Sequence, residues 1–301
     1  MSIQEEQYIQ CPVCGKKSLN KVLDCKDFSL TQEHFDIIEC PNCSLRLTFP
    51  IPTPDKIAPY YNFTDYISHT DIDEGWMNKL YHKVRKRTLH QKTNWIQSLF
   101  TGLKGSILEI GAGTGAFANA MKEKGWKVTA LEPDESTRKR AKDNYKIDVL
   151  PIEDLYILPE NSFDVITLWH VLEHVHELNG YFKAIHKLLK PNGRLIIAVP
   201  NYTSFDAKYY KSFWAAYDVP RHLYHFTPES MDFLSKRYQF KILQTKPMWF
   251  DSFYVSLLSE KYRQSGYLGI LRAFVIGILS NLIALKNNKK SSSVIYEIKH
   301  K

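Results

Sequence analysis

The stretch ILEIGAGTGAF, residues 107–117, constrains the fold of this chain more than any other part of its sequence. An apolar run that predicts a buried strand leads directly into three glycines at alternate positions, and a helical pattern follows over residues 115–124. Glycine allows positive φ and lets a ligand approach the backbone closely. The amide groups at the start of a helix favour negatively charged groups. The stretch therefore predicts a strand, a ligand-binding turn and a helix.

Predicted strands and helices alternate around this turn. Such alternation is typical of an α/β protein with a parallel sheet that helices cover on both faces. In these sheets, ligands bind at the carboxyl ends of the strands. The predicted strands are 106–110, 127–133, 163–171, 194–200, 240–250 and 292–298, and the predicted helical segments include 115–124, 134–144, 178–189 and 251–285.

Glu132 ends the second predicted strand, 21 residues after Gly111. An acid at this position can accept hydrogen bonds from ribose hydroxyls, so a ligand that contains a nucleoside is expected. The glycines also fit the relaxed dinucleotide pattern GxGxxA, with Ala116 as the last residue. A nicotinamide-dependent dehydrogenase is therefore an alternative on these residues alone.

Four stretches, taken together, resemble the class I S-adenosylmethionine-dependent methyltransferases. They occur in the order and at the spacing of that family, and the resemblance covers roughly residues 75–250. It implies a Rossmann-like, seven-stranded methyltransferase sheet and S-adenosylmethionine as the cofactor. The stretches are ILEIGAGTGAF (107–117), LEP (131–133), ENSFDVITLWHVLEHV (160–175) and LLKPNGRLIIAVPN (188–201).

The resemblance also implies where the cofactor binds. The glycine loop would surround its methionine and sugar portions, Glu132 would bind the ribose, and Trp169 and His170 would lie near the methionine end. Many family members have an acid or Asn two residues before Glu153, where this chain has Pro151. The contact to adenine is therefore expected from Glu153, Asp154 or backbone. The implied cofactor-binding residues are Glu109, Gly111, Ala112, Gly113, Gly115, Glu132, Glu153, Asp154, Trp169 and His170.

The positive charge of this cofactor fits the acidic residue that precedes the loop. S-adenosylmethionine carries a sulfonium cation, so its pocket needs a carboxylate rather than a full pyrophosphate cradle, and Glu109 supplies one. Methyl transfer is a single in-line displacement, in which positioning contributes about 7–11 kcal/mol. Acid–base chemistry is needed only when the nucleophile has to lose a proton.

Four of the five cysteines form two CxxC pairs near the N-terminus. In a reducing compartment such pairs hold a metal more often than a disulfide. Two pairs can close a tetrahedral four-sulfur zinc site, which is structural and carries no catalysis. The expected ligands are Cys11, Cys14, Cys40 and Cys43, and Cys25 is expected to be a small buried residue.

WAAYDVPRHLYHFTPESM, residues 214–231, is the expected substrate determinant, because it follows the strand that ends at Pro200. Its segment DVPRHLYHFTP resembles a subgroup of bacterial methyltransferases. The segment LEHVHE, residues 172–177, resembles both that subgroup and the quinone-biosynthetic O-methyltransferases. TPES within the cap predicts a helix start, with Thr227 as N-cap and Pro228 at the first position.

Histidine can remove a hydroxyl proton at neutral pH. His222 and His225 are the first candidates for this role, followed by His170 and His174; the alternative for each is a structural hydrogen bond to backbone. Arg221 either holds an acidic group of the substrate or pairs with Asp218.

The net charge of +8 favours an anionic partner or surface without proving one. Six basic residues on a predicted helix form either a solvated face or a contact to RNA phosphates or anionic lipid. The apolar segment 268–285 is expected to pack on the domain or to lie at a membrane interface, with three lysines after it. The basic helix carries Lys79, Lys83, Arg85, Lys86, Arg87 and Lys92, and the three lysines are Lys286, Lys289 and Lys290.

We therefore expect a cytoplasmic enzyme, since the first ten residues show no secretory pattern. It would methylate a small or lipid-linked acceptor, mainly at oxygen, and residues 268–290 are the candidate segment for a peripheral contact to the inner face of the membrane. The alternatives are an RNA methyltransferase, a non-catalytic cofactor-binding scaffold, and the dehydrogenase. The expected parts are a zinc ribbon (1–50), a Pro-rich linker (51–74), a cofactor-binding core (75–250) with a cap at 201–230, and an apolar helical insertion with a final strand (251–301).

Overall fold

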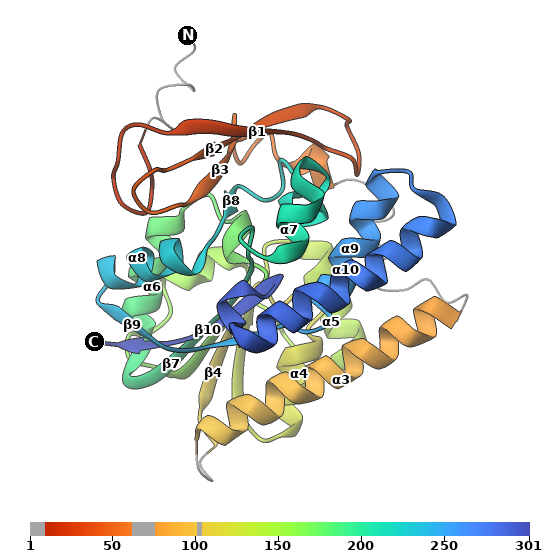
Figure 1. The fold of residues 1–301 in the computed structure, drawn as a ribbon. Helices are drawn as coiled ribbons and strands as arrows, with labels where there is room; N and C mark the ends of the chain where they lie inside the picture. The colour runs from red at the N-terminus through yellow and green to blue at the C-terminus, as the bar shows by residue number, and fades with distance from the viewer. Residues whose placement is uncertain (1–9, 62–75, 101–103) are drawn as a thin grey trace.

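The computed structural model describes residues 10–61, 76–100 and 104–301, and the side chains of residues 76–83 and 85 lie outside the description. Two sheets and the helices around them make up this part of the chain (Figure 1). The larger sheet has the order β5-β4-β6-β7-β10-β9. Its strands are β4 (Ser106–Ile110), β5 (Lys127–Leu131), β6 (Phe163–Trp169), β7 (Leu189–Pro200), β9 (Phe240–Pro247) and β10 (Ser293–His300).

The first four strands of this sheet are parallel, and β10 is antiparallel to both β7 and β9. The parallel arrangement confirms the α/β class, but the seven strands implied by the resemblance are wrong: the described part of the sheet has six. Beyond β5, Leu150 forms only an isolated bridge with Leu131. Pro151 follows at once and has no N–H to donate, so the ladder stops there.

Side chains from alternate positions of the strands fill two separate cores. In β7, Ile196 and Ala198 pack with residues of α3 and α4, whereas Leu195 and Ile197 pack with residues of α6 and α8. This period of two is expected of a sheet that is buried on both faces. The covering helices are α3 (Trp76–Leu99), α4 (Ala116–Glu123), α5 (Glu135–Tyr145), α6 (Leu178–Leu188) and α8 (Pro228–Arg237).

The smaller sheet has the order β1-β2-β3-β8 and contains both N-terminal and cap residues (Figure 1). β1 (Asn20–Lys26), β2 (His34–Glu39) and β3 (Arg46–Phe49) form an antiparallel meander. β8 (Tyr224–His225) comes from the predicted cap and pairs with β3. The cap is thus continuous with the cysteine-bearing sheet, while the proposed domain boundaries stay predictions.

The rest of the cap consists of short elements, all of which carry buried side chains except the turn at Lys211–Phe213. They are α7 (Phe205–Tyr210) and single turns at Lys211–Phe213 and Ala215–Tyr217. α8 begins as predicted, with Thr227 as N-cap, Pro228 in its first turn and a reciprocal hydrogen bond from Ser230. The cap residues therefore form packed structure over the end of the sheet.

The predicted apolar segment at 251–285 forms two helices that lie side by side, α9 (Asp251–Tyr262) and α10 (Gly266–Lys286) (Figure 1). Small residues of α10, among them Gly277 beside Phe253, allow the two helices to approach closely. The opposite face of α10 is apolar and exposed. α10 is long and apolar enough to cross a membrane by length and composition, and a third of its most apolar window is buried in the fold.

Candidate active site

The glycine loop joins β4 to α4 and has left-handed backbone at Gly111, Gly113 and Gly115, with φ of 72°, 53° and 78°. At Gly113 an added Cβ would meet no atom within 4 Å, so this glycine borders open space. At Gly111 an added Cβ would clash with the side chain of Val171. The loop is therefore bare at Gly113, where a ligand can approach, and tightly packed at Gly111.

Glu132 shapes the loop from the end of β5. Its carboxylate accepts the N–H of Gly113 at 2.9 Å and the N–H of Asp134 at 3.2 Å. Burial raises the pKa of Glu132, and these N–H groups oppose the rise. Because each carboxylate oxygen has two lone pairs, Glu132 can accept hydroxyl groups in addition.

Glu109 lies buried at the end of β4, and one of its carboxylate oxygens has no hydrogen-bond partner among the described residues. Burial raises the pKa of Glu109 to about 8, while the charge of Lys92 opposes the rise. Lys92 reaches in from α3, with its Nζ 4.1 Å from the ring centroid of Trp169, and burial lowers its pKa to about 8. A buried carboxylate with one unpaired oxygen beside a bare loop fits a ligand with a positively charged group.

His170 follows β6 and lies between two carboxylates. Its Nδ1 is 3.3 Å from Glu173, and its Nε2 is 3.2 Å from Asp251 at the start of α9. Burial lowers the pKa of His170, but the hydrogen bonds to Asp251 and Glu173 outweigh that effect and raise it to about 9. The His170 imidazole is therefore cationic at neutral pH, and a cationic imidazole does not accept a proton.

His174 and His222 meet beside Glu173. Their rings lie edge to face with centroids 4.6 Å apart, and one potential ligand atom from each of the three residues lies within 4.8 Å of the others. Burial lowers the pKa of His174 to about 4, and the neighbouring His222 adds to this effect. These two imidazoles and the Glu173 carboxylate form a compact cluster, which we call the Glu173 cluster.

His225 lies apart from that cluster, in β8. Its Nε2 is 3.1 Å from Oγ1 of Thr48 in β3, and its ring packs edge to face on Tyr217. Burial keeps the pKa of His225 well below its ordinary value. The structure thus brings together His170, His174 and His222 but not His225, and the catalytic assignments of His222, His225 and His170 stay predictions.

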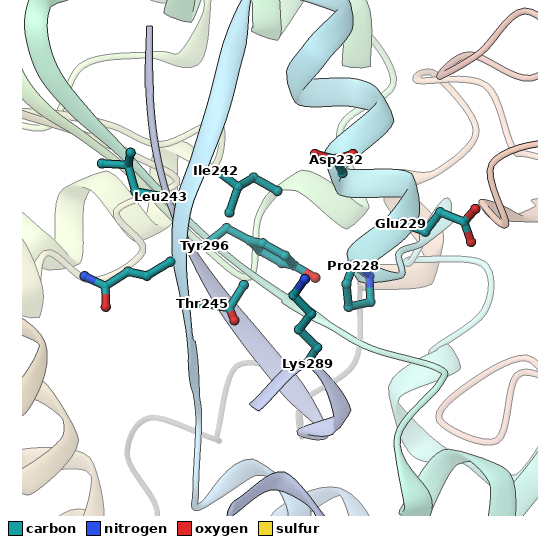
Figure 2. Close-up of a pocket in the computed structure, with 9 residues that line it drawn as sticks. Pro228, Glu229, Asp232, Ile242, Leu243, Thr245, Lys289 and Tyr296 are labelled. Carbon is teal, nitrogen blue, oxygen red and sulfur yellow. The ribbon is translucent and has the colours of Figure 1, made fainter. Parts of the chain in front are cut away.

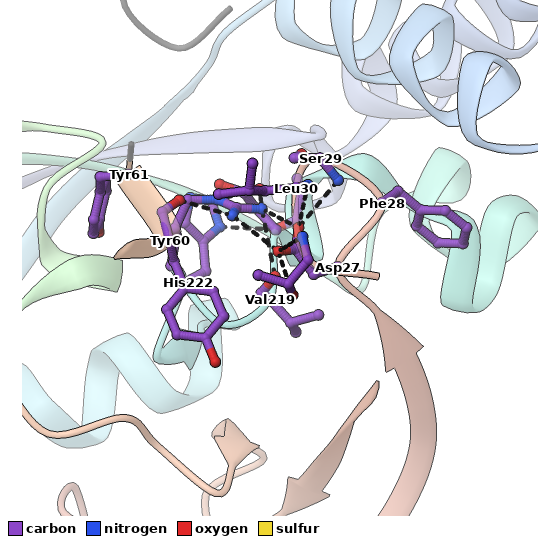
Figure 3. Close-up of polar contacts among 12 residues, drawn as sticks. Asp27, Phe28, Ser29, Leu30, Tyr60, Tyr61, Val219 and His222 are labelled. Atoms are coloured by element: carbon purple, nitrogen blue, oxygen red, sulfur yellow. Dashed lines mark hydrogen bonds and ion pairs between the residues drawn. The ribbon is translucent and has the colours of Figure 1, made fainter. Parts of the chain in front are cut away.

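Arg221 is 1% exposed and binds two carboxylates, of which that of Asp27 is labelled in Figure 3. Its Nη2 lies 2.8 Å from Asp27 of the N-terminal region and 2.6 Å from Asp218 of the cap. Its Nη1 also donates to the carbonyl of Tyr60 at 3.1 Å. Of the two roles considered for Arg221, the structure supports the ion pair with Asp218 and extends it to Asp27.

Glu153 and Asp154 lie in the single turn Ile152–Tyr156, which follows the isolated bridge at Leu150. This turn contacts β5, the strand that leads to Glu132. Glu153 is exposed and Asp154 is half-buried. Both residues therefore lie at the end of β5 that leads to Glu132. Their contact to adenine stays a prediction.

The four predicted zinc ligands converge. Sγ of Cys11 lies 3.5 Å from that of Cys43, and Sγ of Cys14 lies 3.4 Å from that of Cys40. The edges of a tetrahedral four-sulfur zinc site are about 3.8 Å long, as follows from zinc–sulfur bonds of about 2.3 Å. All five cysteines are free thiols, and Cys25 is buried away from the four. The cluster fits a structural zinc ion.

A hollow of about 480 Å³ lies elsewhere, between α8, β9 and β10 (Figure 2). Tyr296, Thr245, Ile242 and Lys289 line it, and none of the predicted site residues does. We assign it no part in the chemistry.

Sequence reasoning missed Asp251 and gave Lys92 another role. Lys92 was placed with the basic helix as a solvated or RNA-contacting residue, whereas it packs on Trp169 next to Glu109. Lys86 and Arg87 of that helix are exposed, and the side chains of Lys79, Lys83 and Arg85 lie outside the described ones. No local signal marks Asp251, because its partner His170 lies 81 positions earlier in the chain.

A family model described as "Methyltransferase domain" matches residues 81–245, more than half of the chain. The ubiquinone biosynthesis O-methyltransferase of Bordetella avium (strain 197N) is 30% identical over 118 residues, which are 36% of this chain and 49% of that protein. The protein of the same name from Idiomarina loihiensis is 34% identical over 155 residues, 49% of this chain and 61% of that protein. The chain thus spans about half the length of the curated relatives it matches.

Two solved structures are similar in fold. Magnesium protoporphyrin IX methyltransferase (ChlM) from Synechocystis PCC 6803 with bound SAH has a TM-score of 0.52 at 14% identity, over 81% of this chain and 98% of that chain. The [4+2]-cyclase SpnF has a TM-score of 0.51 at 16% identity, over 83% of this chain and 98% of that chain. At these identities the likeness shows the fold alone, and the two proteins are named for different reactions.

Proposed function

Because the chain belongs to the methyltransferase domain family, we propose that it transfers the methyl group of S-adenosylmethionine to an oxygen atom of a small or lipid-linked acceptor. The single observation that carries this proposal is the buried Glu109, whose free carboxylate oxygen lies at the strand end that opens into the glycine loop. A sulfonium donor would place a positive charge beside this unpaired oxygen. The names of the curated relatives support oxygen as the acceptor atom.

The residues of the loop would divide the work of binding the donor. Glu132 would hold the ribose hydroxyls, Gly113 would let the donor lie against bare backbone, and Glu109 would face its positive end. When bound, the donor supplies an electrophilic methyl group on sulfur. The acceptor oxygen would attack that carbon in line with the carbon–sulfur bond, whose electron pair stays on sulfur, while the hydroxyl proton leaves. Alignment of this kind contributes on the order of 7–11 kcal/mol.

The proton of the acceptor hydroxyl needs a base. His222 supports this role better than the other predicted histidines, because it is half-buried beside Glu173 and lies in the predicted substrate cap. The ring of His225 is buried and bonded to Thr48, and His170 already lies between two carboxylates. We propose that the cap around His222 binds the acceptor.

The exposed face of α10 supports a lipid-linked acceptor and attachment to an anionic membrane surface. Leu268, Leu271 and Val275 are 74%, 67% and 54% exposed, and Leu282 and Leu285 continue the same apolar face. Exposed apolar surface of this extent marks an interaction site. Lys286 and Lys289 are exposed at the end of the helix, where they would meet acidic headgroups. The other face of α10 packs against α9, whose first residue Asp251 contacts His170, so α9 and α10 connect the exposed apolar face to the site.

Isothermal titration calorimetry with S-adenosylhomocysteine tests the proposed function without knowledge of the acceptor. We expect the wild type to bind this product, and Glu132→Gln to bind it at least tenfold more weakly, because one lost charge-assisted hydrogen bond corresponds to about 1.5–3 kcal/mol. Glu123→Gln is the matched control, since Glu123 is exposed at the far end of α4. Wild-type protein that binds NAD but not S-adenosylhomocysteine would refute the proposal in favour of a dehydrogenase.

A further inference from the structure

We propose that Glu173, His174 and His222 bind a divalent transition-metal ion and that this ion holds the acceptor hydroxyl for methyl transfer. The three residues come from two segments, the turn after β6 and the cap loop before β8. One potential ligand atom from each lies within 4.8 Å of the others, and this group is separate from the four cysteines. The role assigned to the ion rests on the proposed function, whereas the site itself does not.

Both histidines are held through the same ring nitrogen. Nδ1 of His174 lies 3.0 Å from the carbonyl of Arg221 and 3.1 Å from the hydroxyl of Tyr61, whose oxygen can also accept a hydrogen bond. Nδ1 of His222 lies 2.9 Å from the carbonyl of Ala216. A carbonyl can only accept, so each Nδ1 carries the proton and each Nε2 keeps its lone pair. Metal-binding histidines are commonly oriented by this second hydrogen bond. Each ring therefore keeps its Nε2 unprotonated and able to bind a metal.

Glu173 provides independent evidence for a bound cation. It is fully buried, and its Oε1 lies 3.3 Å from Nδ1 of His170. Its Oε2 is also buried, but it has no hydrogen-bond partner among the described residues. A buried carboxylate oxygen without a partner loses its hydration and gains no hydrogen bond in return. A cation between Glu173, His174 and His222 would compensate for this loss.

The ligand set indicates the class of ion. Two imidazoles and one carboxylate suit zinc, iron, cobalt, nickel and manganese, whereas calcium and magnesium prefer oxygen ligands throughout. Three protein ligands leave positions of the ion for water or substrate. The thiolate cluster at the N-terminus would take its own zinc ion and does not share a ligand with this site.

The position of the site suggests its use. Glu173 also contacts His170, which the family resemblance places near the methionine end of the donor. An ion on Glu173 would therefore lie close to the methyl group and could bind the acceptor oxygen as a Lewis acid. With the ion bound, His222 would be its ligand and would no longer serve as the base. The ion would lower the pKa of the hydroxyl, whose proton would pass to water, and the acceptor oxygen would then form its bond to the methyl carbon as the carbon–sulfur bond breaks with its electron pair on sulfur. No oxidant or reductant takes part.

Binding of Mn²⁺, measured by the loss of its free-ion electron paramagnetic resonance signal, tests the site directly. The full chain is first loaded with one equivalent of zinc, so that the cysteine cluster is filled. We expect one further Mn²⁺ to bind, and Glu173→Gln and His222→Asn each to weaken this binding at least tenfold. His176→Asn is the matched control, because His176 bonds the carbonyl of Pro52 outside the Glu173 cluster. Co²⁺, followed by its visible spectrum, is the second probe.

Calorimetry with S-adenosylhomocysteine on the same samples separates this proposal from the proposed function. Retained product binding in Glu173→Gln shows that the variant is folded, so that a loss of Mn²⁺ then supports the site. The site is refuted if neither ion binds the zinc-loaded wild type, or if both variants bind as the wild type does. It stands if Mn²⁺ binds in the expected pattern while S-adenosylhomocysteine does not bind, and in that case the proposed function alone fails.

Discussion

The backbone N–H of Leu223 donates a 2.7 Å hydrogen bond to the carbonyl of Glu173. This bond joins the cap loop to the turn after β6, and it sets the ring of His222 beside His174. One residue further, β8 pairs the same loop with β3 of the cysteine-bearing sheet. The cap loop is therefore bonded both to the turn after β6 and to the N-terminal sheet. Substitutions in the N-terminal region are therefore expected to affect the candidate active site.

Gly113→Val should abolish donor binding and leave the fold largely intact. The valine would project into the open space beside the loop, and left-handed φ costs a non-glycine residue about 1–2 kcal/mol. Gly266→Val is the matched control, since Gly266 also has positive φ and open space but lies at the start of α10. Calorimetry with S-adenosylhomocysteine and urea unfolding of both variants check this. Equal loss of product binding in both variants would contradict it.

Affinity for S-adenosylmethionine should rise with pH. Burial raises the pKa of Glu109 to about 8, so the carboxyl is mostly protonated at pH 7 and mostly ionised at pH 9. If only the carboxylate binds the sulfonium cation, the affinity increases about tenfold between these pH values. Calorimetric titrations at pH 7, 8 and 9 measure the rise. Glu109→Gln should bind weakly and with a flat profile, and an unchanged rise in that variant would be inconsistent with the role given to Glu109.

Asp27→Ala should destabilise the protein by about 3–5 kcal/mol, because it leaves the buried Arg221 short of a charge partner. It also removes the acceptor for the N–H groups of Ser29 and Thr31 (Figure 3). Asp36→Ala is the control, since Asp36 pairs with the exposed Lys21 at the surface and should cost less than about 1 kcal/mol. Urea unfolding measures both. Similar losses of unfolding free energy in the two variants would show that the buried pair stabilises the fold no more than the surface pair does.

Cys40→Ser should release one equivalent of zinc and lower the melting temperature. The metal holds the two CxxC turns together, and its binding free energy contributes to folding. Cys25→Ala is the control, because Cys25 is buried in another cluster and should keep the zinc. Metal analysis and thermal unfolding follow the two variants. If Cys40→Ser keeps a full equivalent of zinc, the four-sulfur site is not the place where the metal binds.

Leu271→Glu should reduce binding to vesicles of phosphatidylglycerol and phosphatidylcholine by about tenfold or more, because burial of one leucine contributes about 1.5–3 kcal/mol. Ile157→Glu is the control, since Ile157 is 78% exposed on a different surface. Co-sedimentation at low salt gives the binding curves. Absence of vesicle binding by the wild type, or a concentration-dependent dimer that Leu271→Glu dissociates, would exclude the membrane as the occupant of this face.

Much of the fold follows from local patterns. The alternation of apolar residues in β7 indicates burial on two faces of the sheet. The glycines after β4 indicate left-handed backbone. Both are properties of short segments. The spacing within the CxxC pairs likewise predicted four sulfurs that the structure brings within 4.8 Å of one another. The number of strands could not be read in this way, because a proline at position 151 stops the ladder after one bridge.

The sequence by itself determined the α/β class, the ligand-binding loop with Glu109 and Glu132, and the cysteine cluster. Only the tertiary structure decided that Asp251 binds His170, that Lys92 lies on Trp169, and that His222 rather than His225 joins Glu173. The physical reason is that propensity and periodicity act over a few residues. The meeting of charged side chains depends instead on which strands are neighbours and on how the cap folds back over their ends.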